Sequence, residues 1–385
     1  MKRPGIVFAV SLVVSSLAAA QPIGWLQRGV VGPCARFTHA MAHDSARGTN
    51  VLFGGSTSSS IIPNGETWEW NGDPLTHWVQ REVVGPSARW GHAMAFDSAR
   101  GVTVLFGGST GGDETWEWDG NVWNRRLVTG PSPRAYPAMT YDSARGVVVL
   151  FGGATSDPNQ HNGETWEWNG VAWTRRFVSS PAGRFGAAMS YDSIRQVSVL
   201  FGGSTDSFGG TSGETWEWNG NVWQLRAGEG PAKRYGHAMA YDPTRRVTLL
   251  FGGWRPNVGL DGDTWKWNGS SWSQRVVTGP PSRYYHSVAF DATRKTIMLF
   301  GGLRYVGPND IVNGETWELN CFADLNGDDQ TDDADFVLFA AAYDTLDCED
   351  PSMPGDCPSD LNRDGFVDDA DFVMFVAAYD ALLCP

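Results

Sequence analysis

Hydrophobic residues recur in a unit of about 50 residues through most of this 385-residue chain. Each unit contains an apolar run that ends in Phe-Gly-Gly, and the phenylalanines of these runs are Phe53, Phe106, Phe151, Phe201, Phe251 and Phe300. Self-similarity at a period of this size is the signature of an architecture built from one repeated supersecondary unit. The sequence therefore predicts six copies of one structural unit.

Each unit predicts four short antiparallel strands. Residues 234–242 are typical of the first strand, and a turn such as Asp97–Gly101 leads to the apolar second strand. Thr-Trp-Glu-Trp alternates large apolar with polar or small residues and predicts the third strand. Asn169-Gly170 favours a tight hairpin turn before a fourth strand over residues 171–176. Four such strands make one blade, so the six units predict an all-β, six-bladed β-propeller.

The sixth unit has no fourth strand of its own. In the other units a tryptophan marks that strand and an arginine follows three residues later; these tryptophans are Trp78, Trp123, Trp173, Trp223 and Trp272. The sixth unit has no such residue after Trp317, whereas Trp25 near the N-terminus has Arg28 at the same distance. We expect residues 24–30 to form the outer strand of the sixth blade, so that the N-terminal strand closes the ring and removes a free edge.

The repeated motifs resemble those of a known family. The double glycine after an apolar strand, the Trp pair and the single Trp of the fourth strand resemble kelch repeats, most of all those of bacterial secreted proteins and of the galactose-oxidase propeller. The resemblance covers residues 21–320 and implies a kelch-type propeller. A copper site of the galactose-oxidase kind would need a Cys crosslinked to Tyr and several His ligands. Cys34 is the only cysteine in this part of the chain, and the histidines there either occupy the repeated position or stand singly, so no such site is expected.

Residues 321–385 contain a second repeat of different composition. Seventeen acidic residues and one basic residue lie there, so this region has a formal charge of −16, against −14 for the whole chain. Residues 324–335 and 360–371 align and place oxygen-bearing side chains at positions 1, 3, 5, 9 and 12. This is the EF-hand calcium-loop pattern, with Asp at position 12. The candidate calcium ligands are Asp324, Asn326, Asp328, Gln330, Asp332, Asp335, Asp360, Asn362, Asp364, Phe366, Asp368 and Asp371.

An amphipathic helix is expected after each acidic loop, because aromatic residues recur there on one helical face. These residues are Phe336, Phe339, Tyr343, Phe372, Phe375 and Tyr379. Two loop-plus-helix units in about 60 residues resemble a dockerin. The resemblance implies a small α-helical domain over residues 321–385, two bound calcium ions, and a cohesin-like or cell-surface protein as partner.

Two departures from the dockerin pattern change the expected calcium affinity and the expected partner. Asp329 stands where the sharp turn of the first loop favours glycine, which predicts a weaker first calcium site. Positions 10 and 11 are Asp333-Ala334 and Asp369-Ala370, where cellulosomal dockerins often have Ser-Thr facing the cohesin. This difference argues against a cellulosomal cohesin as the partner.

Four of the five cysteines lie in the C-terminal region and are expected to form two disulfides. Cys321 and Cys357 precede the loops, whereas Cys348 and Cys384 follow the expected helices. In two units related by a pseudo-twofold axis, the start of one unit meets the end of the other. This favours Cys321–Cys384 and Cys348–Cys357, with pairing inside each unit as the open alternative. Cys34 is then left free.

The N-terminus predicts export. Lys2 and Arg3 precede an apolar run over residues 6–17 and three alanines at residues 18–20. This order is typical of a signal peptide over residues 1–20, cleaved near Ala20, and indicates a secreted or cell-surface protein. The apolar run is too short to cross a bilayer, so we expect no membrane insertion. Basic and acidic residues nearly balance in the rest of the propeller region, which excludes a basic field for nucleic acid.

Charged residues and histidines also recur at fixed positions of the unit. A site that acts on one ligand molecule must break the sixfold symmetry, so we interpret these sets as structural. The arginines are Arg36, Arg89, Arg134, Arg184, Arg234 and Arg283, and the acidic residues are Glu66, Glu114, Glu164, Glu214, Asp263 and Glu315. We interpret four histidines at one position as structural too, instead of as a metal site: His39, His92, His237 and His286.

The segments between the second and third strands differ most from unit to unit, and function concentrates in loops on a rigid scaffold. Trp254 is the one tryptophan that fits neither the repeated tryptophan positions nor the aromatic position after the linker arginine, and Arg255 follows it. Arg304 and Tyr305 lie at the equivalent place in the next unit. These four are the candidate ligand-binding residues, suited to stacking on a sugar ring or on a partner's side chain.

No nucleophile elbow, zinc signature or sialidase-type Asp-box occurs in the sequence, so no catalytic residue is predicted. We therefore expect an exported, non-catalytic protein whose propeller binds a protein or a glycan and whose calcium-binding domain docks it to a partner. The alternative is a carbohydrate-active enzyme of polysaccharide catabolism that hydrolyses O-glycosyl bonds, because dockerins usually accompany such enzymes.

Overall fold

The computed structural model describes residues 24–72, 77–157, 161–206, 210–226, 230–306, 309–319, 333–343, 359–361, 366–369, 371–373 and 375–376. The chain divides into two compact units, one spanning residues 24–321 and the other formed mainly by residues 330–384. The predicted signal peptide and four of the five cysteines lie outside the described residues, so neither the leader nor the disulfide pairing is tested. No helix among the described residues is long and apolar enough to cross a membrane.

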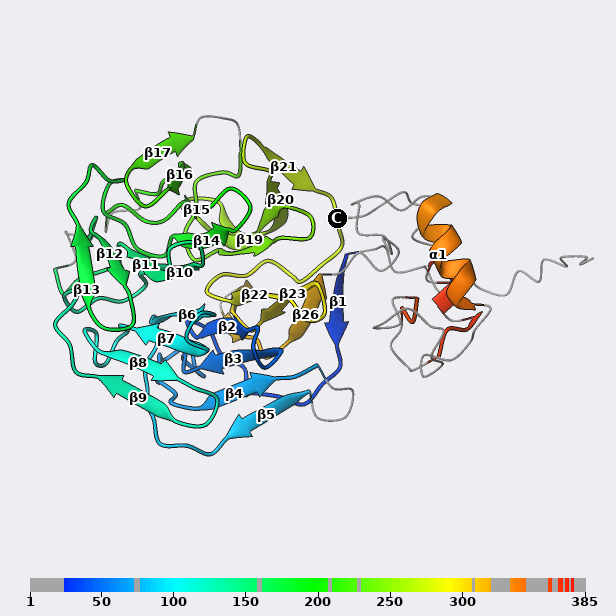
Figure 1. Ribbon diagram of the computed structural model, residues 1–385, viewed down its shortest axis with the longest axis horizontal. Coiled ribbons are helices and arrows are strands. Elements are labelled where there is room, and N and C mark those ends of the chain that lie inside the picture. Colours follow the sequence, from blue (N-terminus) through cyan, green and yellow to red (C-terminus); the bar gives the residue numbers. More distant parts are fainter. Residues whose placement is uncertain are drawn as a thin grey trace, which may run out of the picture. The chain divides into compact units, whose positions relative to one another are not determined.

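The larger unit is a six-bladed β-propeller, as the sequence predicts (Figure 1). The first blade contains β2 (Ala40–Asp44), β3 (Thr49–Phe53), β4 (Thr67–Trp70) and β5 (Trp78–Arg81), and the second contains β6 (Ala93–Asp97), β7 (Val102–Phe106), β8 (Thr115–Trp118) and β9 (Trp123–Arg126). The third contains β10 (Ala138–Asp142), β11 (Val147–Phe151), β12 (Thr165–Trp168) and β13 (Trp173–Arg176), and the fourth contains β14 (Ala188–Asp192), β15 (Val197–Phe201), β16 (Thr215–Trp218) and β17 (Trp223–Arg226).

The last two blades carry longer strands or an added hairpin. The fifth contains β18 (Ala238–Asp242), β19 (Val247–Arg255), β20 (Gly259–Trp267) and β21 (Trp272–Arg275). The sixth contains β22 (Ser287–Asp291), β23 (Thr296–Phe300), β26 (Thr316–Leu319) and β1 (Trp25–Arg28), with a separate hairpin of β24 (Leu303–Val306) and β25 (Asn309–Val312). The first strand of each blade contacts the first strands of both neighbouring blades and is therefore innermost. Figure 1 shows this arrangement for β2, β6, β10, β14 and β22.

The N-terminal strand closes the ring, and this prediction is confirmed. Strand β1 pairs antiparallel with β26, with Trp25 opposite Leu319 and Arg28 opposite Thr316. The indole N–H of Trp25 donates to the Thr264 hydroxyl of the fifth blade over 3.2 Å. The corresponding tryptophan of every other blade donates to the matching threonine of the preceding blade. The sixth blade is therefore bound to its neighbour by the same contact as the others, although its outer strand comes from the other end of the chain.

The hydrophobic core lies between neighbouring blades. Strand β3 buries Val51, Leu52 and Phe53 completely. Successive side chains point to opposite faces of a sheet, so Val51 and Phe53 pack on Met94 of the second blade while Leu52 packs on the sixth. Both faces of the second strand are covered in this way, which explains why it reads as a continuous apolar run in the sequence.

The repeated arginines and acidic residues are structural, as predicted. We call the repeated strands of the blades, together with these charged residues, the frame. Arg134 is 2 % exposed, donates to the backbone carbonyl oxygens of Ser132 and Gly152, and pairs with Glu164 at 2.8 Å. Burial is the largest influence and opposes ionisation of Glu164, but the hydrogen bonds from Arg134 and Trp166 and the charges of Arg134 and Arg175 together outweigh it and hold the pKa of Glu164 below its ordinary value. The same pairing recurs in the other five blades, so these charges hold the ends of strands together.

The second unit contains α1 (Asp333–Tyr343). Phe339 of this helix is 1 % exposed and its ring stacks on that of Phe375, with 4.7 Å between the ring centroids. Phe336 and Tyr343 make further ring contacts with Phe375 and Phe372. The aromatic faces that follow the two acidic loops in the sequence therefore pack against each other.

Candidate functional site

Six residues, one from each blade, surround the central channel where the innermost strands begin. We call them the channel ring: Thr38, Gly91, Tyr136, Gly186, Gly236 and Tyr285. The backbone N–H of each donates to the carbonyl oxygen of the corresponding residue in the preceding blade, over 2.5 to 3.1 Å. These six hydrogen bonds form a closed circle around the channel. The circle requires the same backbone conformation in all six blades, whatever side chain each residue carries.

That conformation is left-handed in all six blades. The φ angles of the channel ring lie between 54° and 67°, a region that glycine enters at no steric cost. Three positions are glycine, but Thr38, Tyr136 and Tyr285 adopt the same conformation at φ values of 56°, 55° and 54°. A bulky residue there is an outlier, and such outliers concentrate at functional sites. The two tyrosines therefore stand at positions where the backbone favours glycine.

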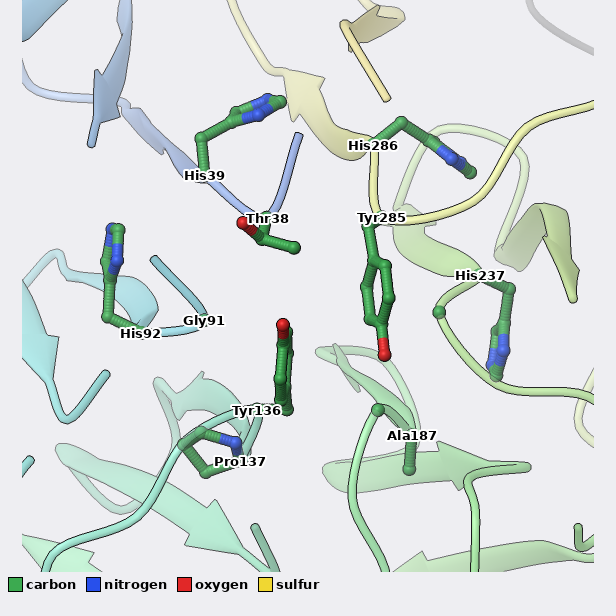
Figure 2. Close-up of a pocket in the computed structure, with 12 residues that line it drawn as sticks. Thr38, His39, Gly91, His92, Tyr136, Pro137, Ala187, His237, Tyr285 and His286 are labelled. Carbon is green, nitrogen blue, oxygen red and sulfur yellow. The ribbon is translucent and has the colours of Figure 1, made fainter. Parts of the chain in front are cut away.

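Tyr136 and Tyr285 meet inside the channel (Figure 2). They come from the third and sixth blades, which lie opposite each other in the ring, and their rings stack with 4.9 Å between centroids and 24° between planes. Neighbouring glycines leave room for them. A Cβ atom on Gly91 would lie 3.1 Å from the Tyr136 ring, and one on Gly236 would lie 3.2 Å from the Tyr285 ring. Glycine at these two positions thus serves both the backbone conformation and the close packing.

The tyrosine hydroxyls are available for a ligand. Neither the Tyr136 nor the Tyr285 hydroxyl has a hydrogen-bond partner among the described residues, and each can donate and accept. Burial raises the pKa of both phenols, most strongly that of Tyr285, so both stay protonated at neutral pH. A cavity of about 110 Å³ lies beside them, lined by the channel ring and the residue after each of its members.

Further aromatic side chains extend from this tyrosine pair across five blades. We call this series the aromatic strip; in order of contact it is Trp90, Tyr136, Phe185, Tyr235, Tyr285, Tyr284 and Trp254. Consecutive ring centroids lie 4.7 to 6.1 Å apart. All seven side chains are half-buried, so each is held by the protein while part of it remains open to solvent. The strip begins in the second blade and ends on the fifth.

The four predicted ligand-binding residues lie on hairpins, not in loops, so the interpretation of these segments as loops was wrong. Trp254 and Arg255 belong to the extended β19–β20 hairpin, where Arg255 pairs with Asp261 at 2.7 Å. Trp254 reaches the aromatic strip through the Tyr284 ring at 5.8 Å. Arg304 and Tyr305 lie on β24 in the added hairpin of the sixth blade, and Tyr305 is 58 % exposed. Alternating apolar and polar residues in both segments favour strands.

Trp254 is thus the predicted residue that joins the strip, and four tyrosines of the site were missed: Tyr136, Tyr235, Tyr284 and Tyr285. The sequence did contain a signal for two of them, because tyrosine stands at a position of the repeat where other units have glycine. Aligned on the frame arginine, the channel-ring position is glycine in three units and tyrosine in two.

The recurring histidines point away from the channel ring, as Figure 2 shows. His92 packs edge-on against Phe53 of the preceding blade, and its Nε2 lies 3.1 Å from the Phe53 carbonyl oxygen. Burial, and then the nearby Arg89, lower the pKa of His92 to about 3, so it is neutral. His39, His237 and His286 pack on phenylalanines in the same way. This packing agrees with the structural interpretation. No group of three or more potential metal ligands occurs in the part of the chain that the structure describes.

The described part of the second acidic loop is compatible with a calcium site. Asp371, at position 12, is fully buried, and its carboxylate accepts hydrogen bonds from the backbone N–H of Leu361 and of Asp368. These residues stand at positions 2 and 9, so the last carboxylate of the loop lies against its beginning. Asp335, at position 12 of the first loop, is buried as well. The predicted ligands Asp324, Asn326, Asp328, Gln330, Asp332, Asn362 and Asp364 lie outside the described residues.

The comparisons with known proteins bear on the fold. No family model and no curated protein matches the chain. Among solved structures, the chain is similar to one titled "Structure of YjhT", with a TM-score of 0.55, 15% sequence identity, and coverage of 74% of this chain and 95% of that chain. Likeness at this identity shows a shared propeller fold, and the six-bladed architecture is therefore supported both by the strand pairing and by this structural neighbour.

Proposed function

We propose that this is an exported, non-catalytic binding protein. Its propeller binds a glycan at the channel ring and the aromatic strip, and its C-terminal unit, a dockerin-like EF-hand domain, binds calcium and docks to a cohesin-like or cell-surface protein. The kelch-type assignment of the propeller is part of the same proposal, because it rests on the repeated motifs of the sequence.

The observation that carries the glycan proposal is the tyrosine pair in left-handed backbone. A left-handed conformation costs an L-residue roughly 1–2 kcal/mol, and three sister blades avoid the cost with glycine. Tyrosine at positions 136 and 285 therefore gives the backbone no advantage over glycine. What tyrosine adds is an aromatic face and an open hydroxyl in the channel. Aromatic faces with a few well-placed polar groups are what small-molecule sites use to hold and orient a ligand.

A non-catalytic role is supported by the state of the ionisable groups near the channel. The acidic residues at the start of each third strand are bound by buried arginines, and the histidines beside the ring are neutral and face the blades. General acid–base catalysis needs groups with a pKa near the working pH and access to the substrate. The rival assignment, a polysaccharide-degrading enzyme, would need such a pair.

A glycan array probed with the full mature chain tests the glycan proposal. We expect selective binding that Tyr285→Gly abolishes, because glycine is the residue of three sister blades and keeps the backbone conformation. Gln196→Gly is the matched control, since Gln196 is another left-handed residue, at the turn after the innermost strand of the fourth blade. Absence of binding to every glycan would overturn the proposal, and release of sugars or oxidation products in parallel would establish the enzymatic alternative.

Calcium binding is tested separately by circular dichroism. We expect calcium to increase the helicity of the full chain and EDTA to reverse it. Asp371→Asn should weaken the calcium response by more than tenfold in concentration, because position 12 supplies the last ligand of the loop. Asp369→Asn is the matched control: it removes the same charge at position 10, which is not a ligand position. No response to calcium in the wild type would sink this part of the proposal.

A further inference from the structure

We propose that the propeller binds a glycan chain of several sugar units lying across the channel ring along the aromatic strip, instead of a single sugar that enters the channel. This inference rests on the proposed function and specifies its ligand class. Three features of the described residues carry it: the closed channel, the tilt of successive rings, and the places where the strip ends.

The channel is closed to a sugar ring at the level of the tyrosine pair. Tyr136 and Tyr285 come from opposite blades and stack at its centre. The space left beside them is about 110 Å³, whereas a cavity of about 150 Å³ is known to accommodate benzene. A pyranose with its hydroxyl groups is larger than benzene. The tyrosine pair therefore forms the floor of a surface site, and the ligand rests on it.

The aromatic strip is a series of separate faces, not one flat platform. Consecutive rings are tilted against each other by 34° to 57°, whereas Tyr136 and Tyr285, which also contact each other directly, are tilted by 24°. One flat platform suits one sugar ring. A stepped series suits a chain whose successive rings turn relative to one another, because each sugar then meets the face of a different side chain. The strip crosses five adjacent blades, which is far more aromatic surface than a single sugar covers.

The two ends of the strip differ in a way that orients the chain. Toward the first blade the strip stops, because Phe37 is buried and the Thr38 hydroxyl donates to its backbone carbonyl. At the other end Trp254 stands on the extended hairpin of the fifth blade, and Tyr305 is exposed on the neighbouring hairpin of the sixth. We infer that the chain continues beyond the channel over these two hairpins.

The test is titration calorimetry of the full mature chain with neutral oligomers of glucose, xylose, mannose and galactose, each from one to six units. We expect affinity to rise with length and to level off once the strip is covered. Trp90→Ala and Trp254→Ala, at the two ends, should weaken the longest oligomer by about tenfold and leave the shortest unchanged, since each removes one aromatic contact. Tyr285→Gly should weaken every length.

The possible outcomes separate this inference from the proposed function. If a single sugar binds as tightly as the longest oligomer, or if the end variants weaken all lengths equally, the chain-binding inference is overturned while glycan binding stands. If no oligomer and no arrayed glycan binds, the proposed function fails first. Leu127→Ala serves as the control for surface effects, because Leu127 is 85% exposed on the outer rim and lies outside the strip.

Discussion

Two of the circles of left-handed residues in this propeller contain residues other than glycine, and they differ in what those residues are. The first is the channel ring. The second lies at the turn after each innermost strand and consists of Gly48, Gly101, Gly146, Gln196, Arg246 and Lys295, at φ values of 51° to 67°. Each circle has three glycines and three other residues. The backbone requirement is the same in both, so the side chains show what else each position does.

At the turn, the residues that replace glycine are exposed, long and polar. They differ from one another and extend into solvent, so they serve no shared purpose that the structure shows. In the channel ring, two of the three replacements are the same residue, come from opposite blades and stack on each other. The comparison separates tolerated variation on a repeated frame from side chains that form a site. The predictions below test that separation, beginning with the strongest expected effect.

Acid should destabilise the frame more than any single substitution. Burial lowers the pKa of His92 and of His237 to about 3, well below the value of about 6.5 expected in the unfolded chain. The unfolded state therefore binds more protons between these two pH values. The contribution of these histidines to the free energy of unfolding is complete above pH 6.5 and is lost as the pH drops toward 3. Each such histidine should lower the free energy of unfolding by about 1.4 kcal/mol for every pH unit of acidification in that window. Urea denaturation from pH 7 to pH 4 measures the slope.

A histidine variant isolates this contribution from other acid effects. The position of His92 is occupied by Ala187 in the fourth blade, so His92→Ala introduces a side chain that the frame already accommodates. The slope of stability against pH should fall by one histidine's share. An unchanged slope would show that carboxylates, not the buried histidines, control the acid transition.

Loss of a frame arginine should have the next largest effect. Arg134→Ala leaves the Gly152 carbonyl oxygen and the Glu164 carboxylate without their buried partner, which should lower the free energy of unfolding by about 3–5 kcal/mol. Arg175→Ala is the matched control, because Arg175 pairs with the same carboxylate at 2.9 Å from a side chain that is 42% exposed. Its loss should cost at most about 1 kcal/mol. Equal effects in chemical denaturation would contradict the assignment of the buried arginines to the frame.

The frame could be predicted from the sequence because the same strand pattern occurs in all six units. Six copies of the apolar second strand predicted the blades, and Trp25, which lies outside any complete unit, predicted the closure of the ring. The site could not be predicted, because its contacts join residues of opposite blades. Alignment of the units places glycine where Tyr136 stands, which points to a left-handed backbone, but nothing in the sequence indicates that Tyr136 meets Tyr285, about 150 positions later. The extended hairpins were missed because these segments differ in length from unit to unit, which suggested loops although their apolar and polar residues alternate as in strands.

Removal of a channel tyrosine should change stability less than removal of a frame arginine. Tyr285→Gly loses the burial of a half-buried ring and the stacking contact, which is worth about 0.5–1.5 kcal/mol beyond burial, and it gains relief from a left-handed conformation that costs roughly 1–2 kcal/mol. These losses and this gain oppose each other, so the free energy of unfolding should move by no more than about 2 kcal/mol. A loss as large as that of Arg134→Ala would place Tyr285 in the frame and remove the distinction drawn above.

The smallest effect belongs to the turn, where backbone conformation acts almost alone. Gln196→Gly places in the fourth blade the residue that the first three blades already have, and should stabilise the protein by about 1 kcal/mol because the left-handed strain disappears. Gly146→Ala is the reverse change at the same position of the third blade. No atom lies within 4 Å of the added Cβ, so any cost comes from the backbone alone. The midpoint of thermal unfolding should rise for Gln196→Gly and fall for Gly146→Ala. Shifts of the same sign would mean that side chains at the turn, as in the channel ring, contribute more than the backbone conformation alone.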